Sequence, residues 1–316
     1  MNTAMTWPKT ATICEVGLRD GLQNEKQILS VDQKLEILDS IIDSGIKIIE
    51  IGSFVHPKAV PQMANTGELA KRMRRFPGVE YRVLVPNLKG LERAHDSGLK
   101  KVKLTVSSSE THCKANFNQT PLEMMEGFKE CVEFAAKNDI EISGALSSAW
   151  GCAWEGKLET VQIEKLTRRF LELGIRELSL SDATGMADPR HIYEMGGYLK
   201  NAFPEVKWVL HLHNTRGMAL ASVIAALQVG ITTFDGAFAG LGGCNFIPGA
   251  AGNVATEDLI HMLHEMNVDT GVDLSKAIIT GHLVERIMEH KGGSYVLQAG
   301  RNSDLVQKKA QEQNNK

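Results

Sequence analysis

The sequence lacks the paired cysteines that hold structural zinc ions. Five cysteines are spread over 316 residues, and no two of them have the C-x-x-C spacing of a metal site. An odd number of widely spaced cysteines predicts reduced thiols in a cytosolic protein. A thiolate-rich structural zinc site is thereby excluded, so a metal site in this chain has to use nitrogen and oxygen ligands.

Long hydrophobic runs and clustered charge of one sign are also missing. No apolar run approaches the ~18 residues of a membrane-spanning helix, and residues 1–10 contain neither a signal-like apolar segment nor an arginine-rich amphipathic pattern. The 35 basic and 38 acidic side chains give a net charge of -3 without a block of either sign. We therefore expect a cytoplasmic protein without a nucleic-acid or membrane partner.

What the sequence does contain is a regular alternation of strand-like and helix-like segments. Hydrophobic residues make up 43% and charged residues 23% of the chain, as in a soluble globular enzyme. Short runs rich in β-branched residues predict strands at residues 12–16, 46–51, 81–85, 101–106, 140–146, 177–180, 208–213 and 232–238. The segments between them that are long enough to be helices are residues 31–44, 68–75, 88–97, 122–137, 161–173, 189–202 and 219–229.

Eight strand–helix units in about 240 residues predict a (β/α)8 TIM barrel, an α/β fold. A doubly wound open sheet is the rival, but no G-x-G-x-x-G follows the first strand and that fold rarely has eight units. Several predicted helices end in a glycine that we expect in the left-handed conformation, at Gly45, Gly98, Gly174 and Gly230.

Beyond the eighth strand we expect extra C-terminal helices, one opened by Thr256 and one over residues 274–290. The prediction is a single catalytic domain over residues 1–300, followed by a polar tail over residues 301–316.

The run His211-Leu212-His213 ends the seventh predicted strand. Residues two apart on a strand share a face, so both imidazoles project to one side. Because active sites of such barrels lie at the carboxyl ends of the strands, Asp20 after the first strand is expected nearby, and Asn253 can add an amide oxygen. These ligands suit Mg2+, Mn2+ or Zn2+. The alternatives are histidines in ordinary hydrogen bonds and, for Asp20 and Asn253, turn or cap residues.

Other polar residues are expected at the same end of the barrel. Arg19 can stabilise an enolate or carboxylate oxygen, or form a solvated ion pair. Glu50 lies inside an apolar run, and a buried carboxylate needs a partner, for which Arg19 is the natural choice. Polar residues also end the second and sixth strands, namely Ser53, Ser179 and Asp182, and Asp235 lies in the eighth strand.

A glycine-rich stretch over residues 240–253 leaves the mouth of the eighth strand and contains Cys244. It can be a closing lid whose cysteine acts as an acid or base, or a plain connection with an inert thiol. On the fourth strand, Lys103 is the best candidate for the nucleophile of a Schiff-base aldolase. A catalytically silent barrel that acts as a binding protein is a further alternative.

Residues 13–26, ICEVGLRDGLQNEK, resemble the first-strand signature of the 3-hydroxy-3-methylglutaryl-CoA lyases. The resemblance continues in the same order through residues 53–63, 86–90 and 240–253, and it runs from about residue 12 to 290. It implies retro-Claisen cleavage of a 3-hydroxyacyl-CoA to acetyl-CoA and a keto acid, as in leucine degradation. It also implies Mg2+ or Mn2+ as the cofactor, with no organic cofactor beyond the CoA of the substrate. We expect the protein to form a homodimer.

The resemblance also carries roles to individual residues. The implied metal ligands are Asp20, His211, His213 and Asn253, and the implied catalytic residues are Arg19, Asp20, Glu50, His211 and Cys244. Of the catalytic residues, Arg19 is expected to stabilise the enolate and Glu50 to orient the Arg19 side chain. Cys244 is expected to exchange protons with the substrate. Candidate substrate contacts are Gln23, Lys26, Ser53, Ser107, Ser179, Asp182, Ala183 and Arg216, with Lys26 and Ser107 toward CoA.

The chain departs from the family pattern near the expected acyl pocket. Ala183 stands where a threonine is usual, and Arg216 and Phe246 each replace a tyrosine. Loss of a hydroxyl at position 183, with apolar bulk from Phe246 and Trp154, predicts an alternative substrate such as citramalyl-CoA or another methyl-malyl-type ester. Arg216 would then contact its carboxylate.

Overall fold

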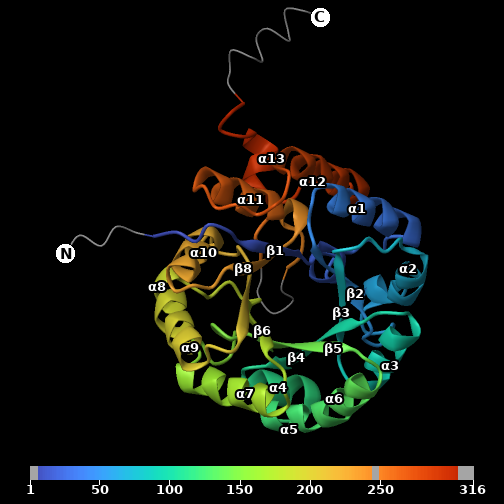
Figure 1. The fold of residues 1–316 in the computed structure, drawn as a ribbon, viewed down its shortest axis with the longest axis vertical. Coiled ribbons are helices and arrows are strands. Elements are labelled where there is room, and N and C mark those ends of the chain that lie inside the picture. The colour runs from blue at the N-terminus through green and yellow to red at the C-terminus, as the bar shows by residue number, and fades with distance from the viewer. Residues whose placement is uncertain (1–5, 244–248, 305–316) are drawn as a thin grey trace, which may run out of the picture.

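The computed structural model describes residues 6–243 and 249–304, and these form a closed barrel of eight parallel strands surrounded by helices (Figure 1). Each strand pairs with the next along the chain, and the last pairs with the first. The barrel prediction is confirmed, with strand bounds within two residues of those expected: β1 (Thr12–Glu15), β2 (Ile48–Ser53), β3 (Glu80–Val85), β4 (Lys101–Ser107), β5 (Glu141–Ser147), β6 (Glu177–Asp182), β7 (Lys207–Leu212) and β8 (Thr233–Gly236).

The crossover helices form the outer ring, as predicted. They are α1 (Val31–Asp43), α2 (Thr66–Arg72), α3 (Leu88–Asp96), α5 (Pro121–Glu126), α6 (Phe128–Lys137), α7 (Thr160–Glu172), α8 (Pro189–His191), α9 (Gly197–Ala202) and α10 (Ala219–Gln228). The short π-helix η3 (Ile192–Gly196) joins α8 to α9. The predicted helix over residues 122–137 is divided at Gly127, and α4 (Glu110–Phe117) is an additional helix after β4.

The predicted glycine helix ends adopt the left-handed conformation. Gly45, Gly98, Gly174 and Gly230 have φ values of 101°, 75°, 80° and 79°. A side chain at these positions would be strained, so each glycine lets the chain leave its helix and turn toward the next strand.

After β8 the chain makes the short turn η4 (Phe238–Gly240) and then α11 (Thr256–Glu265), α12 (Leu274–Met288) and α13 (Tyr295–Ala299). These helices gather on one side of the ring, beside α1 (Figure 1). The Ser40 hydroxyl lies 2.7 Å from that of Thr280 and joins α1 to α12. The carboxylate of Asp258 accepts hydrogen bonds from the backbone of Tyr295 and Val296, which holds α13 against α11.

Charged side chains fill part of the barrel interior. At the amino-terminal end, Arg82 is 1% exposed and its guanidinium bonds Glu80 on its own strand and Glu177 on β6. None of the described helices is long and apolar enough to cross a membrane.

Candidate active site

Asp20, His211 and His213 converge at the carboxyl end of the barrel. Asp20 lies in η1 (Gly17–Gly21), the π-turn that follows β1, while His211 is in β7 and His213 comes directly after it. The Oδ2 atom of Asp20 is 3.2 Å from His213 Nε2 and 3.6 Å from His211 Nε2. One ligand atom from each of the three buried residues lies within 4.8 Å of the others, which is a spacing that a single metal ion can bridge.

Asn253 joins this group through the backbone. It forms an isolated β-bridge with His213, and its Nδ2 lies 2.8 Å from Asp20 Oδ2. The bridge requires Gly252, because a Cβ added there would be 2.1 Å from the carbonyl oxygen of Gly240. Glycine therefore allows the segment to pass close to η4 and to present Asn253 at the site.

The atoms of this cluster fit a divalent cation. Asn253 Oδ1 is buried and has no hydrogen-bond partner in the described part of the chain. Asn253 Nδ2 also donates to the Leu241 carbonyl oxygen at 3.1 Å, so a half-turn of the amide would place Oδ1 beside that oxygen and the Asp20 carboxylate. A cation would stabilise such a cluster of oxygens. On the other side, Asp235 Oδ2 is 3.1 Å from His211 Nδ1, and this contact directs the lone pair of Nε2 toward Asp20.

Asp20 is ionised in this setting. Burial alone would raise its pKa, but the Arg19 guanidinium and the hydrogen bond with His213 outweigh burial and hold the pKa of Asp20 well below its ordinary value. The site therefore offers a carboxylate and two imidazoles together.

Arg19 lies beside the cluster and is held by two carboxylates. Its Nε donates to Glu50 Oε1, and its Nη1 donates to Asp20 Oδ1. Two bonds to different nitrogens fix the plane of the guanidinium. Glu50 is fully buried on β2 and orients Arg19 without lining the pocket described below.

The contacts of Lys103 favour an ion-pair role over that of a Schiff-base nucleophile. Its Nζ donates to Glu50 Oε2 and lies 3.7 Å from Asp235 Oδ2. Burial lowers the pKa of Lys103, but the charges of Asp235 and Glu50 outweigh it, so that the pKa is raised. These contacts favour the protonated amine, whereas a Schiff base requires a neutral amine.

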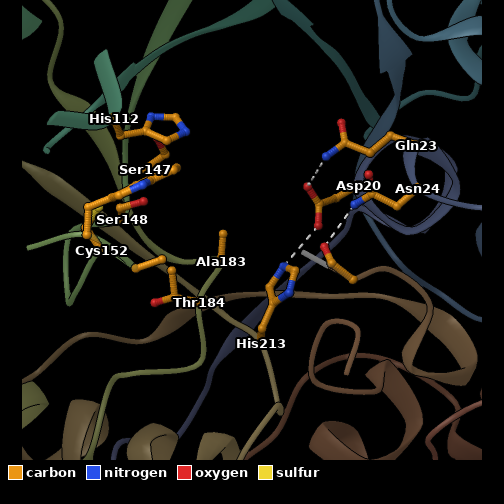
Figure 2. A pocket seen from close by; sticks show the side chains of 13 residues that line it. Asp20, Gln23, Asn24, His112, Ser147, Ser148, Cys152, Ala183, Thr184 and His213 are labelled. Atoms are coloured by element: carbon orange, nitrogen blue, oxygen red, sulfur yellow. Dashed lines mark hydrogen bonds and ion pairs between the residues drawn. The ribbon is translucent and has the colours of Figure 1, made fainter. Parts of the chain in front are cut away.

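A cavity of about 200 Å3 opens beside Asp20 and His213 (Figure 2). Asp20, Gln23, Asn24 and His213 form one wall, and the Gln23 amide is 3.4 Å from Asp20 Oδ1. The opposite wall comes from α4, from the end of β5 and from the loops after β5 and β6, and contains His112, Ser147, Ser148, Cys152, Ala183 and Thr184. Trp154 also lines the cavity, so Ala183 and Trp154 are the two residues on this side that the sequence predicted. Ser147 was not predicted, although its position at the end of the fifth strand is a signal that could have identified it.

Two predicted substrate contacts instead shape the loop that carries Ala183. The Asp182 carboxylate accepts hydrogen bonds from the backbone of Met186 and Ala187, both 2.9 Å long. Arg216 Nη1 donates to the carbonyl oxygens of Thr184 and Gly185 at 3.0 and 2.9 Å. Arg216 does not line the cavity, so the expected carboxylate contact from this residue has no support in the described structure.

The remaining predicted contacts are divided between the interior and the surface. Ser53, Ser107 and Ser179 are buried at 3% exposure and do not line the cavity, whereas Lys26 is exposed. Cys244 and Phe246 lie outside the described residues.

Comparisons with known proteins agree with the barrel fold. Residues 10–284 match the family model described as HMGL-like. The human mitochondrial hydroxymethylglutaryl-CoA lyase is 40% identical over 93% of this chain and 90% of its own length. The HMG-CoA lyase structure from Bacillus subtilis has a TM-score of 0.90 and 40% identity, and the match covers 93% of this chain and 99% of that one. An HMG-CoA lyase from Acinetobacter baumannii in complex with coenzyme A and 3-methylmalate has the same TM-score and 37% identity, over 94% and 97% of the two chains.

Proposed function

The chain belongs to the HMGL-like family, and on that premise we propose that it is a divalent-metal-dependent carbon–carbon lyase. Its substrate is 3-hydroxy-3-methylglutaryl-CoA or a close 3-hydroxyacyl-CoA, and its products are acetyl-CoA and a keto acid. The observation that carries the proposal is the convergence of Asp20, His211 and His213, with the guanidinium of Arg19 bonded to the same aspartate.

The chemistry of this cleavage accounts for each group at the site. The tertiary hydroxyl of the substrate loses its proton, the bond between C2 and C3 breaks, C3 becomes a ketone and C2 becomes the enolate of acetyl-CoA. A bound Mg2+ or Mn2+ would polarise the hydroxyl and the carbonyl that forms from it. Arg19 stabilises the negative oxygen of the enolate, which gains a proton at carbon. We assign both proton transfers to Cys244, on the basis of its place in the glycine-rich loop: its thiolate would take the proton of the hydroxyl, and the resulting thiol would return a proton to the enolate carbon.

The direct test is acetyl-CoA release by the purified protein in the presence of Mg2+ or Mn2+. We expect acetyl-CoA and keto acid to form from 3-hydroxy-3-methylglutaryl-CoA in equal amounts, as measured by chromatography of the thioesters and a coupled assay for the keto acid. Metal analysis of the same protein provides the control, because a silent barrel has no reason to hold one ion per chain. A protein that holds the ion and cleaves none of a panel of 3-hydroxyacyl-CoA esters would refute the lyase assignment.

A second candidate substrate is a shorter methyl-branched ester such as citramalyl-CoA. Ala183 lines the cavity, and its methyl group stands where the family pattern has a hydroxyl. The 3-methylmalate in the Acinetobacter relative is a methyl-branched dicarboxylate shorter than methylglutarate. Both observations favour a pocket that accepts short acyl groups.

We expect Ala183→Thr to shift the relative kcat/KM toward the glutaryl substrate. One added hydrogen-bonding group changes the free energy of a bound substrate by about 1 to 3 kcal/mol, which corresponds to roughly ten- to hundredfold in efficiency. The measurement is kcat/KM for both esters, and Ala153→Thr, at an exposed residue of the same cavity, is the matched control. If the glutaryl ester is the better substrate of the unmodified protein and Ala183→Thr leaves the ratio unchanged, the second candidate is wrong.

A cytoplasmic location and a homodimer complete the proposal. Light scattering of the purified protein tests the dimer, because it reports the mass of the particle directly.

A further inference from the structure

We propose that Lys103 is a positioning residue that couples the arginine of the site to its metal-binding histidine. The inference builds on the proposed function and assigns a role to a lysine on β4 that touches neither the cavity nor a metal ligand. It rests on a closed circuit of buried polar contacts between ionisable side chains, here called the charge ring, which consists of Asp20, Arg19, Glu50, Lys103, Asp235 and His211.

The charge ring has two arms that meet at Lys103. In the first arm, Glu50 uses Oε1 to accept from Arg19 and Oε2 to accept from Lys103. In the second arm, Asp235 uses Oδ2 for both neighbours, with 3.7 Å to Lys103 Nζ and 3.1 Å to His211 Nδ1. Asp235 Oδ1 is buried without a hydrogen-bond partner among the described residues, so the carboxylate is oriented through this one shared oxygen.

Burial makes the ammonium group necessary. The side chains of the ring are at most 9% exposed, and Glu50 and Asp235 are at 0% and 1%. When His211 is neutral, the charge ring contains three carboxylates and two cations, and the cations are Arg19 and Lys103. Removing Lys103 would leave three buried carboxylates with one cation, and an uncompensated buried charge is strongly unfavourable.

Loss of the lysine should therefore disturb both arms. Asp235 would no longer be held against His211 Nδ1, and partners of this kind typically change metal affinity about 10- to 100-fold. Glu50 would lose the contact that holds its second oxygen, and the plane of Arg19 would be less well defined. A residue with a purely local structural role would not change metal affinity and turnover together.

The test compares Lys103→Met with Lys101→Met. Lys101 lies on the same face of β4, two residues earlier, and bonds Glu141 and Glu177 at the other end of the barrel. Mn2+ affinity is measured by electron paramagnetic resonance on chelator-treated protein, and kcat and KM are measured with the preferred ester. We expect Lys103→Met to weaken Mn2+ binding about 10- to 100-fold and to lower kcat, and Lys101→Met to stay within about threefold of the unmodified protein in both.

A double-mutant cycle identifies the route of the effect. If Lys103 acts on the metal site through Asp235, Lys103→Met combined with Asp235→Asn should weaken Mn2+ binding no more than Asp235→Asn alone. Additive losses in Mn2+ affinity would overturn the inference, as would a Lys103→Met variant with the Mn2+ affinity and kcat of the unmodified protein.

Lys103→Arg keeps the charge and provides the test if the methionine variant does not fold. Its wider guanidinium alters both contacts, so we expect Mn2+ affinity and kcat to decrease, each by less than in a neutral variant. Unmodified affinity and kcat in Lys103→Arg, together with an unfolded Lys103→Met, would show a role in stability alone and would overturn the inference. The Mn2+ measurement needs no substrate, so absence of acyl-CoA cleavage would refute the proposed function while leaving this test intact.

Discussion

Treatment of the purified protein with EDTA should reduce acetyl-CoA release to the level of a blank without enzyme, and excess Mg2+ or Mn2+ should restore it. The reason is that Asp20, His211 and His213 offer their ligand atoms within 4.8 Å of one another in a buried site. No lysine or arginine is found among the described residues that line the cavity, so in the proposed reaction the metal ion would supply the positive charge that polarises the substrate hydroxyl and the developing ketone.

Circular dichroism of the chelator-treated protein is the control, because the apolar core does not involve the site and the fold should persist. Full acetyl-CoA release in EDTA would contradict the metal-dependent mechanism.

Borohydride reduction in the presence of substrate should leave no covalent adduct, since the protonated Lys103 is held by Glu50 and lies close to Asp235.

The second large effect is expected for Arg19→Gln, which should lower kcat by roughly 100- to 1000-fold, with a much smaller change in Mn2+ affinity. The guanidinium stabilises charge that appears mainly on the enolate, and one such electrostatic contact is typically worth about 2.7 to 4 kcal/mol in the transition state. Because Arg19 also bonds Asp20, a modest loss of Mn2+ affinity is expected.

Arg82→Gln is the matched control for Arg19→Gln. It removes another buried guanidinium from the barrel interior, where Arg82 bonds Glu80 and Glu177 and does not line the cavity. We expect this variant to lose thermal stability while retaining most of its kcat. If kcat of Arg19→Gln falls by less than about tenfold, Arg19 has a structural role. Loss of an electrostatic contact with the transition state, of the size seen in oxyanion sites, would lower kcat further.

The parts of the fold that depend on local chemistry could be predicted from the sequence. Short β-branched runs separated by helices with glycine ends predicted all eight strands and the closed barrel, because strand preference and left-handed glycine are properties of a few neighbouring residues. The His211-Leu212-His213 spacing placed two imidazoles on one face for the same reason. Their convergence with Asp20 followed from the rule that parallel strands present their carboxyl ends together.

Contacts between distant strands were decided only by the tertiary structure. The sequence identified Glu50 as a buried carboxylate and Lys103 as a possible nucleophile, but closure of the barrel brings the two together across its interior and makes the lysine an ion-pair partner. Arg216 likewise had the right charge for a substrate carboxylate, yet the turn after β6 presents two backbone carbonyls that it binds instead. Chain periodicity determines which face a side chain occupies, whereas the identity of its partner depends on how strands far apart in sequence are packed.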